Sequence, residues 1–254
     1  MAGILALSGC SEVAEDPGLH AVSWPGSDGR PVVLNADLRV EFDRPLAPGL
    51  RAGAFHLFDF TSGEPVAAEL EVAGRFLVFR PALPLSADLA DGGLLPGRDY
   101  GIDLCGVPRL AAVAGRDGSV LVGTQRIRFR TLSAADPGAL VAMDGGDEPL
   151  RVLPIGTANK HLVVQADGTV RFFLSGPVDP RTLAPARLLT SEGASKVEEV
   201  PLRLLSNSPA GSEIEAQVGL WTGWRRLELP GGLEGMGGRR LVETDRLLGL
   251  RGGP

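Results

Sequence analysis

The sequence predicts an all-β protein made of two β-sandwich domains in tandem, and three observations support this prediction. The 35 glycines and 20 prolines fall regularly along the 254 residues, which is typical of many short strands joined by turns and nearly excludes long helices. Several short segments alternate apolar and charged residues with period two. One pattern of strand and prolines occurs twice, once in each half of the chain.

The repeated pattern begins with a strand that should be half-buried. Residues 37–48 alternate apolar and charged side chains and end in a Pro-x-x-Pro segment. Residues 169–180 follow the same design, and aligning Leu38 with Val170 superposes both pairs of prolines without a gap. A repeat of this kind predicts two related domains.

Further strands are expected in the first half of the chain. Each is a short run with apolar residues at alternate positions, bounded by glycine or proline. Strands at this spacing, with turn signals between them, are typical of a β-sandwich. The expected strands cover residues 55–57, 66–72, 75–80, 100–104 and 127–131.

Tyr100 is the only tyrosine in the sequence. It follows a Pro-Gly turn at residues 96–97 and lies just inside an expected strand. This placement suits a tyrosine corner, in which the phenol hydroxyl bonds a backbone group a few residues upstream. A solitary hydroxyl could also serve catalysis, but the structural role is the prediction we adopt.

The N-terminal sequence Leu7-Ser8-Gly9-Cys10 matches the bacterial lipobox, in which an aliphatic residue and two small residues precede a cysteine. The thiol of that cysteine takes a diacylglycerol through a thioether, and cleavage leaves it as the first residue. Residues 11–18 are polar and acidic with one proline, which indicates a flexible tether. We therefore interpret residues 1–18 as a truncated lipoprotein signal and tether, with Cys10 as the lipidated residue.

One element of a signal peptide is missing. Such a peptide begins with a positive segment and an apolar stretch of about 7 to 15 residues. Here only Met1 and the apolar run from Ala2 to Leu7 precede Ser8-Gly9-Cys10, and they contain no Lys or Arg. The alternative is an ordinary N-terminus with a chance cysteine. Cys105, the other cysteine, is expected to be a small buried residue, with a Cys10–Cys105 disulfide as the alternative.

The segment between the two expected domains contains Asp144, Asp147 and Glu148. These acids could attract calcium, but the EF-hand spacing is absent, so a solvated linker is the prediction. The predicted division of the chain is a signal and tether at 1–18, a first domain at 19–132, a linker at 133–154 and a second domain at 155–250.

Composition and motifs exclude several classes of function. The net charge of −6 argues against a nucleic-acid partner, because phosphate binding needs clustered positive charge. His20, His56 and His161 are isolated in the sequence and lack metal-ligand spacing. No P-loop, dinucleotide fingerprint or GxSxG turn occurs. We therefore expect no catalytic residue, no metal site and no cofactor.

Trp221-Thr222-Gly223-Trp224 is the one segment that suggests a ligand. Two tryptophans in a turn-rich segment could stack on sugar rings. The competing interpretation is that one or both rings pack into the core of the second domain or into a domain interface, and we prefer it because large aromatic side chains dominate core burial.

Five segments of the first half carry a resemblance to a known family, at 24–29, 38–46, 78–85, 95–100 and 128–131. On these segments, residues 19–132 resemble the bacterial Ig-like domain of the SbsA type, found in surface-layer and other exported proteins. An Asp-x-x-Gly-Asn segment usual in the family is replaced at residues 116–119 by Arg-Asp-Gly-Ser. Residues 155–250 resemble the family less closely, through segments 170–180, 227–233 and 237–241. The resemblance implies Greek-key sandwiches with spacing, adhesion or scaffolding roles and no catalytic residues.

Together these features predict two Ig-like Greek-key β-sandwich domains in a non-enzymatic exported lipoprotein, a structural or interaction module of the cell envelope. The expected partners are the bacterial membrane, through the lipid anchor, and an envelope protein or glycan. The alternative is a carbohydrate-binding or accessory module of an envelope enzyme system. A hydrolase would require clustered carboxylates or a histidine dyad, of which the sequence gives no sign.

Overall fold

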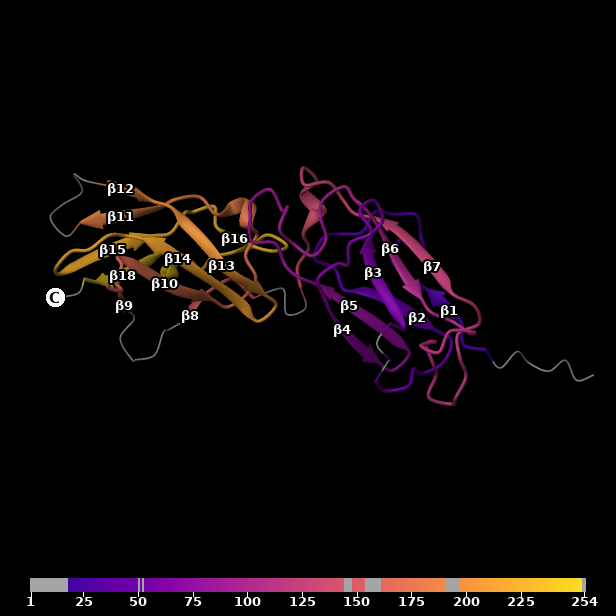
Figure 1. Ribbon diagram of the computed structural model, residues 1–254. Coiled ribbons are helices and arrows are strands. Elements are labelled where there is room, and N and C mark those ends of the chain that lie inside the picture. The colour runs from indigo at the N-terminus through magenta and orange to yellow at the C-terminus, as the bar shows by residue number, and fades with distance from the viewer. Residues whose placement is uncertain are drawn as a thin grey trace, which may run out of the picture.

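The computed structural model describes residues 18–49, 51, 53–143, 148–153, 161–190 and 197–252. Cys10 and the rest of the predicted signal and tether before residue 18 lie outside this part of the chain. The described residues form strands joined by turns and short 3-10 segments. Within them, no helix has the length and apolar character needed to cross a membrane. Figure 1 shows two β-sandwiches that lie end to end.

The N-terminal sandwich consists of two antiparallel sheets with strand orders β1-β2-β5-β4 and β3-β6-β7. This is the order of a constant-type immunoglobulin sandwich, A-B-E-D against C-F-G, in which the chain crosses between sheets in a Greek key. The strands are β1 Ala21–Ser23, β2 Leu38–Phe42, β3 Phe55–Asp59, β4 Ala68–Ala73, β5 Phe76–Pro81, β6 Asp99–Leu104 and β7 Gln125–Arg130.

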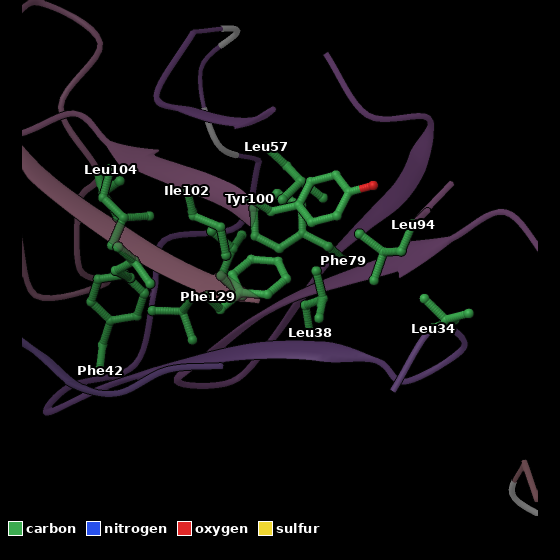
Figure 2. Packing of buried hydrophobic residues seen from close by; sticks show 14 of the residues in the cluster. Leu34, Leu38, Phe42, Leu57, Phe79, Leu94, Tyr100, Ile102, Leu104 and Phe129 are labelled. Carbon is green, nitrogen blue, oxygen red and sulfur yellow. The ribbon is translucent and has the colours of Figure 1, made fainter. Parts of the chain in front are cut away.

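Period-two alternation places the N-terminal core between these sheets. In β2, Leu38, Val40 and Phe42 are buried, while Arg39 faces outward. The facing sheet contributes alternate residues in the same way, so side chains from both sheets converge, as Figure 2 shows. Each fully buried side chain of this size stabilises the fold by about 1.5–3 kcal/mol.

The predicted tyrosine corner is confirmed. The hydroxyl of Tyr100 accepts a hydrogen bond from the Leu95 N–H at 2.6 Å, and the side chain is only 1% exposed. Its ring stacks on Phe129 with 5.6 Å between centroids (Figure 2). Burial raises the pKa of Tyr100, which keeps the hydroxyl neutral.

The C-terminal sandwich has sheets with strand orders β13-β14-β10-β8 and β12-β11-β15-β18-β9. Strand β10 lies between β8 and β14 just as β2 lies between β1 and β5, so the two segments aligned in the sequence repeat occupy equivalent places. Strand β12 extends its sheet at one edge, and β9 runs parallel to β18 at the other. The strands are β8 Val152–Leu153, β9 His161–Val163, β10 Thr169–Leu174, β11 Ala186–Thr190, β12 Val197–Val200, β13 Leu202–Ser208, β14 Gly211–Gln217, β15 Trp224–Glu228 and β18 Leu247–Arg251, with a small ribbon of β16 Glu234–Gly235 and β17 Arg239–Arg240.

Part of the segment expected to be a solvated linker packs against the N-terminal core. Ala139 and Leu140 are buried there, and the Leu34 N–H donates to the carbonyl of Ala139 at 2.8 Å. These few apolar residues follow neither the strand nor the helix period, so the pattern did not separate them from a linker. Asp144 and Asp147 lie outside the described residues.

Replacing Tyr100 by phenylalanine tests the corner. The substitution keeps the ring and its contact with Phe129 but leaves the Leu95 N–H without its acceptor, which should lower the free energy of unfolding by about 1–3 kcal/mol. Urea denaturation measures the change, and the slope of the transition should stay constant. A variant as stable as the parent chain would show that the hydroxyl contributes nothing to the fold.

Candidate functional site

The described residues contain no group of three or more His, Cys, Asp or Glu side chains that could hold a metal. Cys105 is a buried free thiol just after β6, and Nη1 of Arg109 donates to its Sγ at 3.7 Å. The Tyr100 hydroxyl is occupied by a backbone amide. The candidate functional features are instead two outer sheet faces and the junction between the sandwiches.

The outer face of the β3-β6-β7 sheet carries a tightly paired arginine. Arg126 donates from Nε and Nη2 to the two carboxylate oxygens of Asp103, both at 2.6 Å. Its guanidinium carbon lies 5.5 Å from the centre of the Phe58 ring, which itself covers Gly101 closely. Hydrogen bonds from Arg126 hold the pKa of Asp103 below its ordinary value.

The arrangement repeats along the same strands. Arg128 donates to Asp99 at 3.3 Å, and its guanidinium lies 4.3 Å from the Phe60 ring centre. The Phe58 and Phe60 rings stack on each other with 6.2 Å between centroids. Each of these two arginines is therefore satisfied within the chain, by a carboxylate and an aromatic ring.

The two tryptophans singled out in the sequence have different surroundings. Trp221 is partly buried against the C-terminal core, with the Arg225 guanidinium 4.5 Å from its ring centre. Gly252 approaches it so closely that a Cβ there would lie 2.9 Å from the indole nitrogen. Trp221 thus packs as the preferred interpretation expects, whereas Trp224, the first residue of β15, is 49% exposed.

Trp224 belongs to the outer face of the β11-β15-β18-β9 strands. It lies opposite Arg251 of β18, which in turn lies opposite Val163 of β9. In the adjacent row Arg226 lies opposite Gly249. We call these five residues the distal face. Sequence reasoning found Trp224 but missed the two arginines, because outward positions follow only from the pairing of the strands.

The asparagine at position 35 connects the two sandwiches. Its Oδ1 accepts from the Val141 N–H at 2.9 Å, and its Nδ2 donates to the Val141 carbonyl at 2.7 Å. The same Nδ2 lies 3.3 Å from Sδ of Met236, which comes from the C-terminal sandwich. Because Asn35 is buried, it needs these partners to offset the loss of water.

The hydrophobic cores interlock at this junction. Met236 is fully buried in the N-terminal core, although it directly follows β16 of the C-terminal sandwich. Leu85, from the N-terminal half, packs against the C-terminal core in return. Gly237 approaches the Ala142 backbone so closely that any Cβ would collide with it. A change in the angle between the sandwiches would pull these side chains out of their packing.

Polar side chains add further links across the junction. Nδ2 of Asn207, at the end of β13, donates to the carbonyl of Pro84 at 3.0 Å. Arg181 pairs with Asp179 at 2.7 Å and donates from Nη1 to the carbonyl of Asp136 at 3.2 Å. In both contacts a side chain of the C-terminal sandwich donates a hydrogen bond to a backbone carbonyl from the N-terminal half of the chain.

No protein-family model matches the chain, and no curated protein sequence matches it. Among solved structures, it is similar to Escherichia coli α2-macroglobulin spanning domains MG0-NIE-MG1, at 13% identity and a TM-score of 0.40, over 92% of this chain and 71% of that one. It is also similar to the N-terminal part of the bacterial S-layer protein SbsC, at 11% identity and a TM-score of 0.33, over 92% of this chain and 44% of that one.

The Asp103–Arg126 pair makes stability depend on pH. The pKa of Asp103 is lowered in the folded chain, so its contribution is complete above the ordinary carboxyl value of 3.8 and is lost as the pH falls through the lower folded value. Asp103→Asn should therefore cost at most about 1 kcal/mol near neutral pH, because the pair is partly exposed.

Urea denaturation of Asp103→Asn and the parent chain at a series of pH values measures this dependence. The difference between them should shrink as the solution is acidified below 3.8. Glu198→Gln on β12, an exposed carboxyl of the other sandwich, serves as the control and should show little difference at any pH. If the difference in the free energy of unfolding between Asp103→Asn and the parent chain did not change with pH, the charge of Asp103 would not be the source of the stabilisation.

Proposed function

We propose that this chain is a non-enzymatic module of the bacterial cell envelope, anchored through lipidated Cys10, in which two Ig-like domains act as a rigid spacer and interaction platform. The observation that carries the proposal is the interlocked junction, where Met236 fills the N-terminal core and Leu85 packs on the C-terminal one. A fixed angle between domains is what a spacer needs.

Rigidity follows from the energetics of the junction. Domains joined by an exposed polar linker move freely, and a well-packed apolar contact restricts them. Withdrawing a buried methionine from its socket costs about 2–5 kcal/mol on the scale of large-to-small core substitutions. The hydrogen bonds that the side-chain amides of Asn35 and Asn207 donate to Met236 and to the Pro84 carbonyl would be broken in the same motion. A bent conformation is therefore rare at equilibrium.

The position of the N-terminal end of the described chain is compatible with a lipid anchor on the N-terminal side of the molecule. The described chain begins at Gly18, and β1, which follows at Ala21–Ser23, lies on the side of the N-terminal sandwich away from the C-terminal one (Figure 1). A lipid attached just before this point would hold the N-terminal sandwich near the membrane and present the C-terminal one outward. The lipobox sequence and the acidic tether support this orientation.

We place the domains in the SbsA type of the bacterial Ig-like family. The support is the order of matching segments in the sequence, from Trp24-Pro25-Gly26 through the tyrosine corner to the last strand of the N-terminal sandwich. The absence of a recognised catalytic motif in the sequence and the paired charges of the β3-β6-β7 face agree with a structural role.

Cys10→Ala tests the anchor. Expressed in a bacterium behind a complete signal peptide, the parent chain should carry an acyl modification on Cys10 by mass spectrometry and sediment with membranes, whereas Cys10→Ala should be released into the soluble exported fraction. Cys105→Ala, at the buried thiol, is the matched control and should remain with the membrane. Lack of an acyl group on the parent chain, or membrane retention of Cys10→Ala, would contradict the anchor.

Met236→Ala with Asn35→Ala tests the rigid junction. Removing the methionine leaves a cavity in the N-terminal core and removing the amide frees Val141, so the domains should move relative to each other. Small-angle X-ray scattering should fit one conformation for the parent chain and a range of conformations for the variant. Gln217→Ala, which removes a side-chain amide that donates to Asp167 within the C-terminal sandwich, should scatter like the parent. Flexible scattering from the parent chain itself would refute the spacer.

A further inference from the structure

We infer that the distal face binds an acidic polysaccharide, with Trp224 stacking on a sugar ring and Arg226 and Arg251 binding its carboxylates. This inference goes beyond the spacer role and rests on the proposed function only in that an envelope module meets such polymers. The binding chemistry itself belongs to the described residues of the C-terminal sandwich and does not require the anchor.

The strand pairing brings the three side chains together on one face. Residues directly opposite each other share a face, so Trp224 and Arg251 both point outward at the same level. Arg226 follows two residues later on β15 and therefore shares that face as well. Leu227, which follows Arg226 on β15, and Leu250, which precedes Arg251 on β18, are fully buried on the inner side. Neighbours in such a sheet lie about 5 Å apart when opposite and about 7–8 Å apart on the diagonal.

Glycine shapes the middle of this surface. Gly249 lies opposite Arg226 and two residues before Arg251 on β18, so no side chain rises between the two arginines at that position. Val163, which continues the row beyond Arg251, is 68% exposed. The register thus places an indole, two guanidinium groups and an apolar side chain around Gly249.

The two arginines of the distal face have no carboxylate within ion-pair distance among the described residues. Other outward arginines differ in this respect: Arg187 pairs with Glu228 at 3.2 Å in the neighbouring row and Arg126 pairs with Asp103 in the other sandwich, whereas Arg203 on β13 has no ion pair among the described residues. In a protein of net charge −6, two neighbouring arginines beside an exposed indole, with no ion pair to any described residue, offer a place for an external anion.

An acidic sugar satisfies each part of this surface. The apolar face of a pyranose ring packs on an indole, and a guanidinium binds a carboxylate through two parallel hydrogen bonds. A polymer of uronic acids places a carboxylate beside every ring, so a ring on Trp224 brings one carboxylate to Arg251 and the next within reach of Arg226. Tryptophan and arginine are also the residues that most often dominate binding energy at interfaces.

Other occupants fit less well. A second copy of the chain joined by a two-fold axis through this face would place arginines against arginines. A membrane surface lies at the opposite end of the molecule in the proposed orientation (Figure 1). The carboxylates of an acidic polypeptide could pair with the guanidinium groups, but its acidic side chains have no flat apolar ring to place on Trp224. The experiment therefore tests an acidic polypeptide separately.

The experiment measures binding of the full chain carrying Cys10→Ala, so that a failure of the anchor cannot affect it. Isothermal titration would use polygalacturonate as the probe, with dextran as the neutral polymer and polyglutamate as the acidic polypeptide. We expect binding to polygalacturonate that weakens as salt is added, no binding to dextran and clearly weaker binding to polyglutamate.

Variants locate the site. Trp224→Ala, Arg226→Gln and Arg251→Gln should each weaken polygalacturonate binding about tenfold, on the scale of one interface anchor. Arg203→Gln is the matched control, because Arg203 is an exposed arginine on β13 of the opposite sheet and also has no ion pair among the described residues. Thermal unfolding confirms that each variant is folded, and Trp224→Phe should retain part of the affinity if stacking is what Trp224 provides.

Several results would overturn the inference. No binding of polygalacturonate, or equal binding of polyglutamate, would rule out an acidic sugar as the ligand. Equal loss of affinity in Arg203→Gln and the distal-face arginine variants would mean that general charge is responsible. Full affinity of folded Trp224→Ala for polygalacturonate would show that the Trp224 ring does not stack on the sugar. None of these outcomes bears on the anchor or on the rigidity of the junction, which their own measurements address.

Discussion

The buried amide of Asn35 fixes the segment that leaves the N-terminal sandwich, and the position of the second sandwich follows from it. By clamping both backbone groups of Val141, Asn35 holds residues 139–141 against the N-terminal core. That placement brings Ala142 against Gly237 and lets Met236 enter the same core. Without the clamp, residues 139–141 would lose the hydrogen bonds that fix them on the N-terminal core, and the two sandwiches would no longer be held in one relative position.

The sandwich architecture follows from local sequence rules. Alternation in residues 38–42, turn residues between strands and the Pro-Gly-x-x-Tyr segment each act over a few residues, so they can be recognised without knowledge of the fold. The tyrosine corner was predictable for the same reason, since donor and acceptor lie five residues apart in the chain. The repeat between the halves extended the prediction to the second sandwich.

The junction could not be predicted in this way. Asn35 and Met236 are 201 positions apart, and nothing in either local sequence indicates the other. The same holds for the distal face: Trp224 stands out by residue type, but Arg226 and Arg251 are two among many arginines until the pairing of β15 with β18 places them beside it. Residue type suggests that a binding group exists, and strand register determines what surrounds it.

Met236 also has a consequence for how the protein forms. The socket it occupies belongs to the first sandwich, yet Met236 comes after β15 and β16 of the second sandwich in the chain. The residues of the first sandwich are therefore synthesised well before the side chain that fills this socket. A chain that stops before Met236 leaves the apolar socket open, and exposed apolar surface of this kind promotes aggregation and recognition by proteases.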